Sequence, residues 1–377
     1  MQIYVVKSGD TLDTIAADFG LGTETIAYTN QVLPPYRLAV GQALLIPTES
    51  AEKEKRTVYV NGYAYPYIRD WVLTETLPYL TTLSVFSYGF TTSGELVPPA
   101  VNDDWMIEKA LQQNVRPILT LTPFDESGMF NNYLISVLTN DPDLQQTLFD
   151  QLFLVMEEKG FAGIDIDFEY ILAKDRIPFA NFVENVRTQA APLGYTVSVA
   201  LAPKTSADQP GLLYAGKDYG LLGAAADSVL LMTYEWGYTY GPPMAVAPIN
   251  KVREVVEYAV TEIPAEKIDL GIPNYGYDWT LPFTQGVSAA RTIGNIEAVD
   301  IAVENQAVIQ FDETAKSPYF NYERNGVRHE VWFEDVRSIQ EKFNLITEYG
   351  LRGMGYWQIM KLFRANWMLL ADTFEIR

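Results

Sequence analysis

The sequence predicts an α/β fold, a (β/α)8 TIM barrel that follows a small N-terminal domain. Short β-rich apolar runs alternate with helix-like stretches through most of the chain, and a charged segment separates the first 48 residues from them. The strand-like runs are residues 57–65, 83–90, 116–124, 163–170, 196–203, 228–236, 268–279 and 352–358. Eight strands that alternate with helices indicate a closed parallel barrel, whose active site lies at the C-terminal strand ends.

Residues 1–48 form the first predicted unit. A strand (IYVV), a turn (KSGD), a helix with one apolar face, a second short helix at residues 23–30 and a closing strand (ALLIP) follow one another. We therefore expect a small βααβ domain. Residues 49–56, ESAEKEKR, contain almost no apolar side chains, which is typical of a solvated linker. The barrel is expected to span residues 57–377.

The stretches between the strand-like runs have helical periodicity, and two of them, residues 143–160 and 177–194, end in glycine as helices often do. The interval between the seventh and eighth runs is too long for one helix. It contains a helix-like stretch at residues 295–305 and strand-like stretches at residues 307–313, 318–323 and 329–335. We expect a small α+β insertion over the barrel mouth, around residues 280–335.

The charge of the chain limits its partners. Lys and Arg number 27 against 48 Asp and Glu, for a formal net charge of -21. Nucleic acids and anionic membranes attract positive surfaces, so we expect neither as a partner. The chain has no cysteine, and its single histidine, His329, lies in a polar run typical of a surface strand. No cofactor is expected, and the sequence does not determine the oligomeric state.

The N-terminus lacks the pattern of a secretion signal. Asp10 and Asp13 interrupt it before the apolar core of a signal peptide could form. No later run reaches the length of a transmembrane helix. We therefore expect neither classical secretion nor a membrane span.

The decapeptide FAGIDIDFEY, residues 161–170, places Asp165, Asp167 and Glu169 at every second position. Alternate side chains of a strand share one face, so we expect the acids to point into the barrel. Mutual repulsion raises the pKa of at least one acid, which suits a general acid near neutral pH. A charge ladder neutralised by arginine or lysine, or a calcium or magnesium site, could use the same residues. No basic run complements the acids, so catalysis is favoured and no metal is expected.

Aromatic residues gather at the same predicted strand ends. They are Tyr88, Tyr234, Trp236, Tyr275, Trp279 and Trp357. Aromatic faces stack on the apolar faces of pyranose rings, although single aromatic residues more often belong to the core. Tyr234 and Trp357 are the strongest candidates, and a neutral carbohydrate is the favoured ligand.

The first unit resembles a LysM module over nearly all of its length. The matching residues are 4–20 (YVVKSGDTLDTIAADFG), Asn30 and 38–47 (LAVGQALLIP). The resemblance implies binding of N-acetylglucosamine-containing glycans such as peptidoglycan or chitin, in a groove between the loop after the first strand and the loop before the last. The groove would be formed by Gly9, Asp10, Thr11, Leu33 and Pro34. Alternatively, Asp10 or Thr11 only caps the first helix.

The larger unit resembles glycoside hydrolase family 18 from about residue 57 to the end. Residues 162–169, AGIDIDFE, match the family signature Asp-Gly-x-Asp-x-Asp-x-Glu with one departure, Ala162 in place of the first aspartate. MTYEWG at residues 232–237 corresponds to the family's Met-x-Tyr-Asp, with Glu235 replacing the aspartate. Tyr-Trp at residues 356–357 matches the eighth strand.

Further segments are similar to the spore-associated branch of this family, the cortical-fragment-lytic N-acetylglucosaminidases. They include TYEWGYTYGPPMAVAPI, FDETAKSPYFNY and VWFEDVRSI. Such proteins typically carry two LysM modules, where this chain has one. The resemblance implies action on spore cortex peptidoglycan during germination, synthesis in the mother-cell cytoplasm and deposition in the spore coat or cortex. A chitinase acting on chitin or its oligomers, or a glycan-binding protein without catalysis, is the alternative.

The resemblance also implies a retaining, substrate-assisted hydrolysis. Glu169 would be the acid and base, Asp167 would orient the substrate's 2-acetamido group, Asp165 would support Asp167, and Tyr234 would donate to the acetamido carbonyl. Substrate contacts are expected from Trp357, Glu235, Tyr275, Tyr88 and Trp236. In a rival mechanism, Glu235 would attack the sugar as a protein nucleophile.

Overall fold

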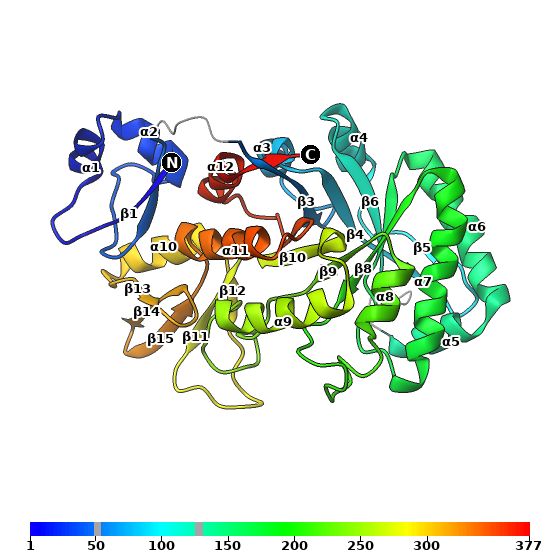
Figure 1. The fold of residues 1–377 in the computed structure, drawn as a ribbon. Helices are drawn as coiled ribbons and strands as arrows, with labels where there is room; N and C mark the ends of the chain where they lie inside the picture. Colours follow the sequence, from blue (N-terminus) through cyan, green and yellow to red (C-terminus); the bar gives the residue numbers. More distant parts are fainter. Residues whose placement is uncertain (49–53, 125–130) are drawn as a thin grey trace.

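The computed structural model describes residues 1–48, 54–124 and 131–377. This part of the chain forms a two-stranded sheet, a ten-stranded sheet and a five-stranded sheet (Figure 1). The ten-stranded sheet closes into a barrel because strand β3 (Arg56–Ala64) pairs in parallel with both β4 (Thr82–Phe90) and β16 (Gly353–Trp357). The predicted (β/α)8 barrel is therefore confirmed.

The other barrel strands lie in sequence order between β4 and β16, each parallel to the next. They are β6 (Arg116–Leu121), β7 (Gly163–Ile166), β8 (Thr196–Leu201), β9 (Ser228–Leu231) and β10 (Ile268–Pro273). Two short strands extend the sheet outside the barrel, β5 (Leu96–Val97) beside β4 and β17 (Phe374–Ile376) beside β3. Each of the eight predicted runs thus contributes a barrel strand.

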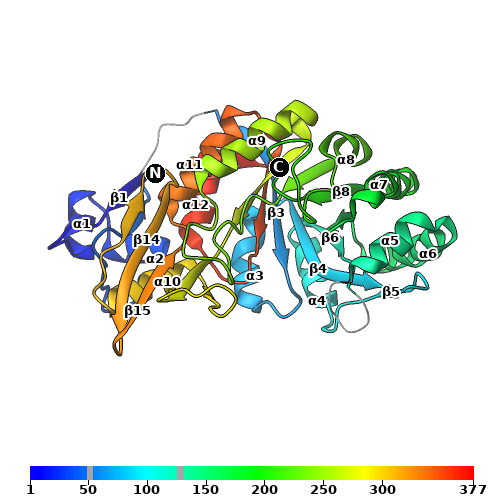
Figure 2. The same cartoon turned by 90° about the horizontal axis from the view of Figure 1, so that it is seen from below.

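Helices flank the barrel strands (Figure 2). They are α3 (Asp70–Thr76), α4 (Asp104–Gln112), α5 (Asn132–Asn140), α6 (Pro142–Lys159), α7 (Arg176–Ala190), α8 (Tyr219–Ala225), α9 (Ile249–Glu262), α11 (Val336–Glu348) and α12 (Arg364–Thr373). Short 3-10 turns occur at Leu77–Tyr79, Ala173–Asp175, Ala191–Leu193 and Ala265–Lys267. The main core lies between the strands and these helices. No helix within the described ranges is both long and apolar enough to cross a bilayer.

The N-terminal unit has the predicted βααβ order. Strands β1 (Gln2–Val5) and β2 (Ala43–Ile46) pair antiparallel, and α1 (Leu12–Asp18) and α2 (Thr23–Asn30) lie between them in sequence. The Asn30 side chain bonds to the backbone of β2 as another strand would: it donates to Leu45 O at 2.8 Å and accepts from Leu45 N at 2.7 Å. This amide ties α2 to the sheet and explains why the motif contains asparagine there.

The insertion between β10 and β16 folds as a separate antiparallel sheet beside the barrel (Figure 1). Its elements are β11 (Gly276–Thr280), β12 (Arg291–Ile293), α10 (Asn295–Glu304), β13 (Gln310–Asp312), β14 (Ser317–Arg324) and β15 (Val327–Trp332). The seventh predicted run was too long: β10 ends at Pro273, and the chain then enters β11. The sheet thus begins before residue 280.

The predicted limits of the domains, residues 1–48, 49–56 and 57–377, stay a prediction. Residues 49–53 of the expected linker lie outside the described part of the chain. Arg56 differs from the expectation because it already belongs to β3, where its Nη1 donates to Ile346 O at 2.8 Å.

Direct contacts join the N-terminal unit to the rest of the chain. The Met1 ammonium pairs with Asp372 at 2.8 Å. The Arg364 guanidinium lies 3.9 Å from the ring centroid of Tyr28 and donates to the Tyr28 carbonyl at 2.8 Å. At Gly41, a Cβ atom would lie 1.8 Å from the carbonyl oxygen of Ile309 in the insertion. The small unit therefore rests against both α12 and the insertion.

A buried ion pair joins α11 to the segment after β15. Lys342 Nζ lies 2.8 Å from Glu334 Oε2, and both side chains are fully buried. We expect Lys342→Met to lower the free energy of unfolding by about 3–5 kcal/mol, because it leaves an uncompensated buried carboxylate. Urea unfolding at neutral pH measures this loss.

The exposed pair of Lys251 and Glu254, at 3.0 Å, offers a matched control. Lys251→Met should change the stability by about 1 kcal/mol at most, since exposed pairs contribute little. Equal losses in the two variants would contradict the importance of the buried pair.

Candidate active site

The three acids of the decapeptide lie at the C-terminal end of β7. Asp165 is on the strand, whereas Asp167 and Glu169 follow it, because β7 ends at Ile166. The alternation nevertheless continues: Phe168 is fully buried on the helix side, with its ring 5.7 Å from those of Phe179 and Phe182. The acids therefore face inward although the strand is shorter than predicted.

Asp165 is held by hydrogen bonds at both carboxylate oxygens. Tyr63 Oη donates to Oδ2 at 2.8 Å, and Ser198 Oγ donates to Oδ1 at 2.6 Å. Burial raises the pKa of Asp165, and the two hydrogen bonds and the charge of Lys217 oppose this shift. Asp165 is thus a fixed acceptor at the base of the acid row.

Asp167 and Glu169 have no such partners. No hydrogen bond from the described residues reaches either carboxylate, and Asp167 Oδ1 is fully buried without a partner. Burial, and then repulsion by Glu169, raises the pKa of Asp167 well above its usual value. Burial also raises the pKa of Glu169. Both carboxyl groups are therefore free of hydrogen bonds from the described residues and line the cleft, where a ligand can contact them.

An aromatic cleft of about 670 Å³ opens over this pair. Besides the two acids, it is lined by Tyr65, Phe86, Phe124, Tyr170, Pro203, Leu213, Tyr214, Met232, Tyr234, Glu235, Trp236, Tyr238 and Trp357. The partly exposed Trp357 ring is packed edge-on against Phe86 at 4.9 Å and Tyr63 at 5.8 Å between centroids. Trp357 is thus a rigid apolar surface beside the acids, as a sugar ring requires.

Tyr234 and Glu235 follow β9 into the cleft. The described residues make no hydrogen bond to the Tyr234 hydroxyl, and burial raises its pKa well above the usual value, so it stays a proton donor. The backbone of Glu235 is left-handed, with φ of +68°, a conformation that is uncommon for residues other than glycine. Tyr275 and Tyr277 both donate to the Glu235 carboxylate, Tyr277 at 2.9 Å.

Two predicted substrate contacts lie elsewhere. Tyr275 is buried, and its hydroxyl holds Glu235 instead of lining the cleft. Tyr88 is fully buried on the helix side, where its hydroxyl donates to Asp103 at 2.7 Å. Strict alternation would place Tyr88 on the same face as Phe86, which lines the cleft. The register of β4 against β6 shifts between Val85 and Tyr88, however, and the alternation fails there. Trp279 is likewise buried, with its indole N–H donating to Gly241 O at 2.8 Å.

Residues 127–361 match the model of the glycosyl hydrolases family 18. The chain belongs to this family. As a member of this family, the protein is a glycoside hydrolase. Residues 4–47 match the LysM domain. The chain is 39% identical to the cortical fragment-lytic enzyme of Bacillus subtilis, over all of this chain and 99% of that protein, and 38% identical to the Bacillus anthracis enzyme of the same name with the same coverage.

The fold has a close solved counterpart. The crystal structure of the Bacillus cereus spore cortex-lytic enzyme SleL superposes with a TM-score of 0.94 at 34% identity, covering 100% of this chain and 98% of that one. The similarity therefore extends over the family 18 barrel and the LysM domain together.

Sequence reasoning missed several residues of the family 18 site. Tyr63 and Ser198 were within predicted strands at inward-facing positions, so alternation could have indicated them. Tyr277 lies in the predicted run 268–279, two residues from both Tyr275 and Trp279, so the same alternation could have indicated it. Lys217, a fully buried lysine whose charge acts on all three acids, lies before α8 in a segment with no local signal. The alternative of a charge ladder thus has one cation near the acids, although Lys217 makes no direct ion pair with them within the described ranges.

His329 and the metal alternative can also be placed. His329 is in β15 of the insertion, partly buried, with Nδ1 2.9 Å from Asp278 Oδ1. Within the described ranges, no group of three or more acidic or histidine side chains is arranged to hold a metal ion.

In the LysM domain, the first predicted binding loop contains a helix cap. Thr11 is the N-cap of α1 and accepts from Thr14 N at 3.1 Å. Asp10 accepts from Lys7 N at 2.7 Å and from Tyr4 Oη at 2.8 Å, and Gly9 is left-handed with φ of +91°. These contacts account for the residue types without a ligand, and glycan binding by this loop stays a prediction.

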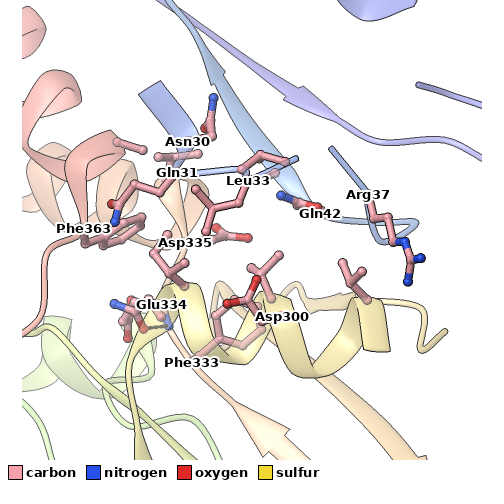
Figure 3. A pocket seen from close by; sticks show the side chains of 18 of the residues that line it. Asn30, Gln31, Leu33, Arg37, Gln42, Asp300, Phe333, Glu334, Asp335 and Phe363 are labelled. Carbon is pink, nitrogen blue, oxygen red and sulfur yellow. Dashed lines mark hydrogen bonds between the residues drawn. The ribbon is translucent and has the colours of Figure 1, made fainter. Parts of the chain in front are cut away.

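The second predicted binding loop faces the insertion. Leu33 and Pro34 line a cavity of about 300 Å³ between the LysM domain and α10. Figure 3 shows Leu33 on the side of α10 that carries Asp300. Gly9, Asp10 and Thr11 lie outside this cavity. A shared groove between the two loops therefore stays a prediction as well.

Proposed function

We propose that this family 18 enzyme hydrolyses glycan strands of spore cortex peptidoglycan after N-acetylglucosamine residues, acting on fragments already opened by another enzyme. The observation that carries the chemistry is a pair of carboxyl groups at the base of an aromatic cleft, the buried Asp167 and the half-buried Glu169, to which the described residues make no hydrogen bond. The substrate is supported by full-length similarity to proteins named for cortical fragment lysis. Their names also support a place of action in the spore cortex, and the LysM domain would hold the same glycan.

In the proposed mechanism, Glu169 protonates the glycosidic oxygen as the bond to the anomeric carbon breaks. The carbonyl oxygen of the substrate's own 2-acetamido group attacks that carbon, which gives an oxazolinium ion. Water then opens the ring, and Glu169 takes a proton from the water, so configuration is retained. The raised pKa of Glu169 supports this role because the acid must be protonated near neutral pH.

The remaining residues stabilise the acetamido group. Asp167 would accept its N–H and offset the positive charge of the oxazolinium ion. Tyr234, a protonated hydroxyl without a partner in the described residues, would donate to the attacking carbonyl oxygen. Asp165 would tune Asp167 by raising its pKa through repulsion, and Trp357 would form the floor beneath the sugar.

A protein nucleophile is the rival mechanism, with Glu235 attacking the sugar. Its carboxylate accepts hydrogen bonds from both Tyr275 and Tyr277. Such bonds stabilise the anion and lower its nucleophilicity, which favours substrate assistance. Glu235 is then a substrate contact rather than a nucleophile.

The position of the cut distinguishes the proposed substrates. Cortex fragments digested with the enzyme and reduced with borodeuteride should carry the label on N-acetylglucosamine, as read by tandem mass spectrometry. Glu169→Gln, which lacks the proposed acid, is the matched blank. Label on muramic acid or its lactam above the level in the blank would contradict the proposed specificity. If the enzyme digested chitin oligomers but not cortex fragments, the result would favour a chitinase. If it bound cortex fragments without producing new reducing ends, the result would favour a non-catalytic glycan-binding protein.

A further inference from the structure

Lys217 is a buried cation that the proposed mechanism does not use. Its side chain is fully buried immediately before α8, and Nζ donates to Ala200 O in β8 at 2.8 Å. Its own carbonyl oxygen accepts from Lys204 Nζ at 2.9 Å. Within the described residues it makes no direct ion pair. Burying an ammonium without a carboxylate in contact is costly, and burial lowers the pKa of Lys217, whereas the charges of Asp167, Glu169 and Asp165 act in the opposite direction.

Two contacts place Lys217 beside the acid row. Strands β7 and β8 pair in register with Asp165 opposite Ser198 and Ile166 opposite Val199, which brings Ala200 to the level of Asp167. The backbone before Lys217 also packs against the chain just past Glu169: a Cβ on Gly216 would lie 2.2 Å from Ile171 O. The ammonium is therefore held by the strand next to the acid row, and the backbone before it packs against the chain that follows Glu169.

The charge of Lys217 acts on every acid of the row. It lowers the pKa of Asp165, Asp167 and Glu169 against the larger effect of burial. The three acids in turn raise the pKa of Lys217, although burial lowers it overall. In the described ranges, Lys217 is the one cation that has this effect on all three.

Other titratable groups surround this cluster. They are Tyr63, Tyr65, Tyr170, Tyr234 and Glu235 around the acids, and Lys204, Asp218 and Tyr219 around Lys217. Burial raises the pKa of each tyrosine, so they remain neutral near neutral pH. The charges of Asp218 and Asp208, rather than those of the acid row, raise the pKa of Lys204 against the larger effect of burial. Asp269 and Arg352, which form an ion pair with each other, line a cavity together with Asp165. Among the described residues, only Lys217 has a positive charge that lowers the pKa of all three acids.

We propose that Lys217 is a positioning residue for the proposed hydrolysis: its buried ammonium lets Asp167 and Glu169 hold one proton between them at neutral pH. Without this charge, both carboxyl groups would stay protonated up to a higher pH. Asp167 would then carry no negative charge to stabilise the oxazolinium ion. The inference rests on the proposed roles of Asp167 and Glu169. It adds a residue that touches no substrate and acts through their charge.

The test is the pH profile of kcat/KM on a para-nitrophenyl glycoside of N-acetylchitobiose. Lys217→Met and Lys217→Gln remove the charge, and glutamine can still donate to Ala200 O. In both variants the acid limb should move up by about one pH unit, with about tenfold lower kcat/KM below the limb. Lys217→Arg keeps the charge and should restore the wild-type limb. Thermal melting of each variant shows whether it is folded.

Lys204→Met is the matched control, because Lys204 is also a buried lysine that donates to backbone carbonyls in the same segment. Its acid limb should stay within about 0.3 pH unit of wild type. An unmoved limb in folded Lys217→Gln, an equal shift in Lys204→Met, or a shifted limb in Lys217→Arg would each overturn the proposal. A wild-type enzyme that hydrolyses no substrate would instead refute the proposed function.

Discussion

Glu169→Gln is expected to lower kcat by about a thousandfold or more while glycan binding is retained. Glutamine has nearly the same shape as protonated glutamate but cannot transfer a proton, and both steps of the proposed mechanism need that transfer. Initial rates on reduced cortex fragments measure the loss in turnover. Isothermal titration with the same fragments measures binding.

Glu184→Gln, an exposed position on α7, is the matched control and should keep wild-type turnover. If Glu169→Gln retained turnover within about tenfold of wild type, Glu169 would not be the acid. If the variant also lost binding, the loss of turnover would report a damaged cleft rather than missing proton transfer. The two measurements together therefore separate chemistry from binding.

Asp167→Asn should cost about a hundredfold in kcat, with a smaller change in KM. Asparagine can still contact the acetamido group but carries no charge to stabilise the oxazolinium ion, which forms only after binding. The variant also removes a negative neighbour of Glu169. Repulsion between like charges raises a carboxyl pKa, so its removal should lower the pKa of Glu169 and move the basic limb of the pH profile to lower pH.

The pH profile of kcat/KM checks this direction. A basic limb that moved to higher pH, or a loss in kcat of less than about tenfold, would contradict the role given to Asp167. Tyr234→Phe is a useful comparison, since it removes a donor to the same acetamido group without changing the charge of the row. Its basic limb should stay where it is in wild type.

Most of the fold could be predicted because its signals are local. Each barrel strand is a short apolar run, and each run was recognisable without reference to its neighbours. The helices α6 and α7 were visible from their periodicity and from the glycines that follow them. The predicted helix of the insertion, residues 295–305, corresponds closely to α10. The periodicity of apolar residues indicates which face of a helix or strand is buried, and each of these elements has such a buried face.

The errors occurred where regular alternation breaks down. Tyr88 has the spacing of an inward residue, but the shifted register of β4 turns it to the helix side. Tyr275 lies at a strand end as predicted, yet its hydroxyl donates to the Glu235 carboxylate and does not line the cleft. The predicted run 268–279 comprises two strands, because the chain passes from β10 of the barrel into β11 of the insertion. Such breaks depend on neighbouring strands, which a single segment does not reveal.

The sequence by itself determined the order of the elements, the inward row of Asp165, Asp167 and Glu169, and the resemblance to family 18. Alternation along one strand suffices for these, because it depends only on residues close in the chain. Tertiary structure alone decided which acids are anchored and which are free, and it placed Lys217 beside them. The partners of Asp165 come from β3 and β8, and the cation comes from the segment before α8. Protonation depends on burial and on charges brought together from distant segments, and only the closed barrel brings them together.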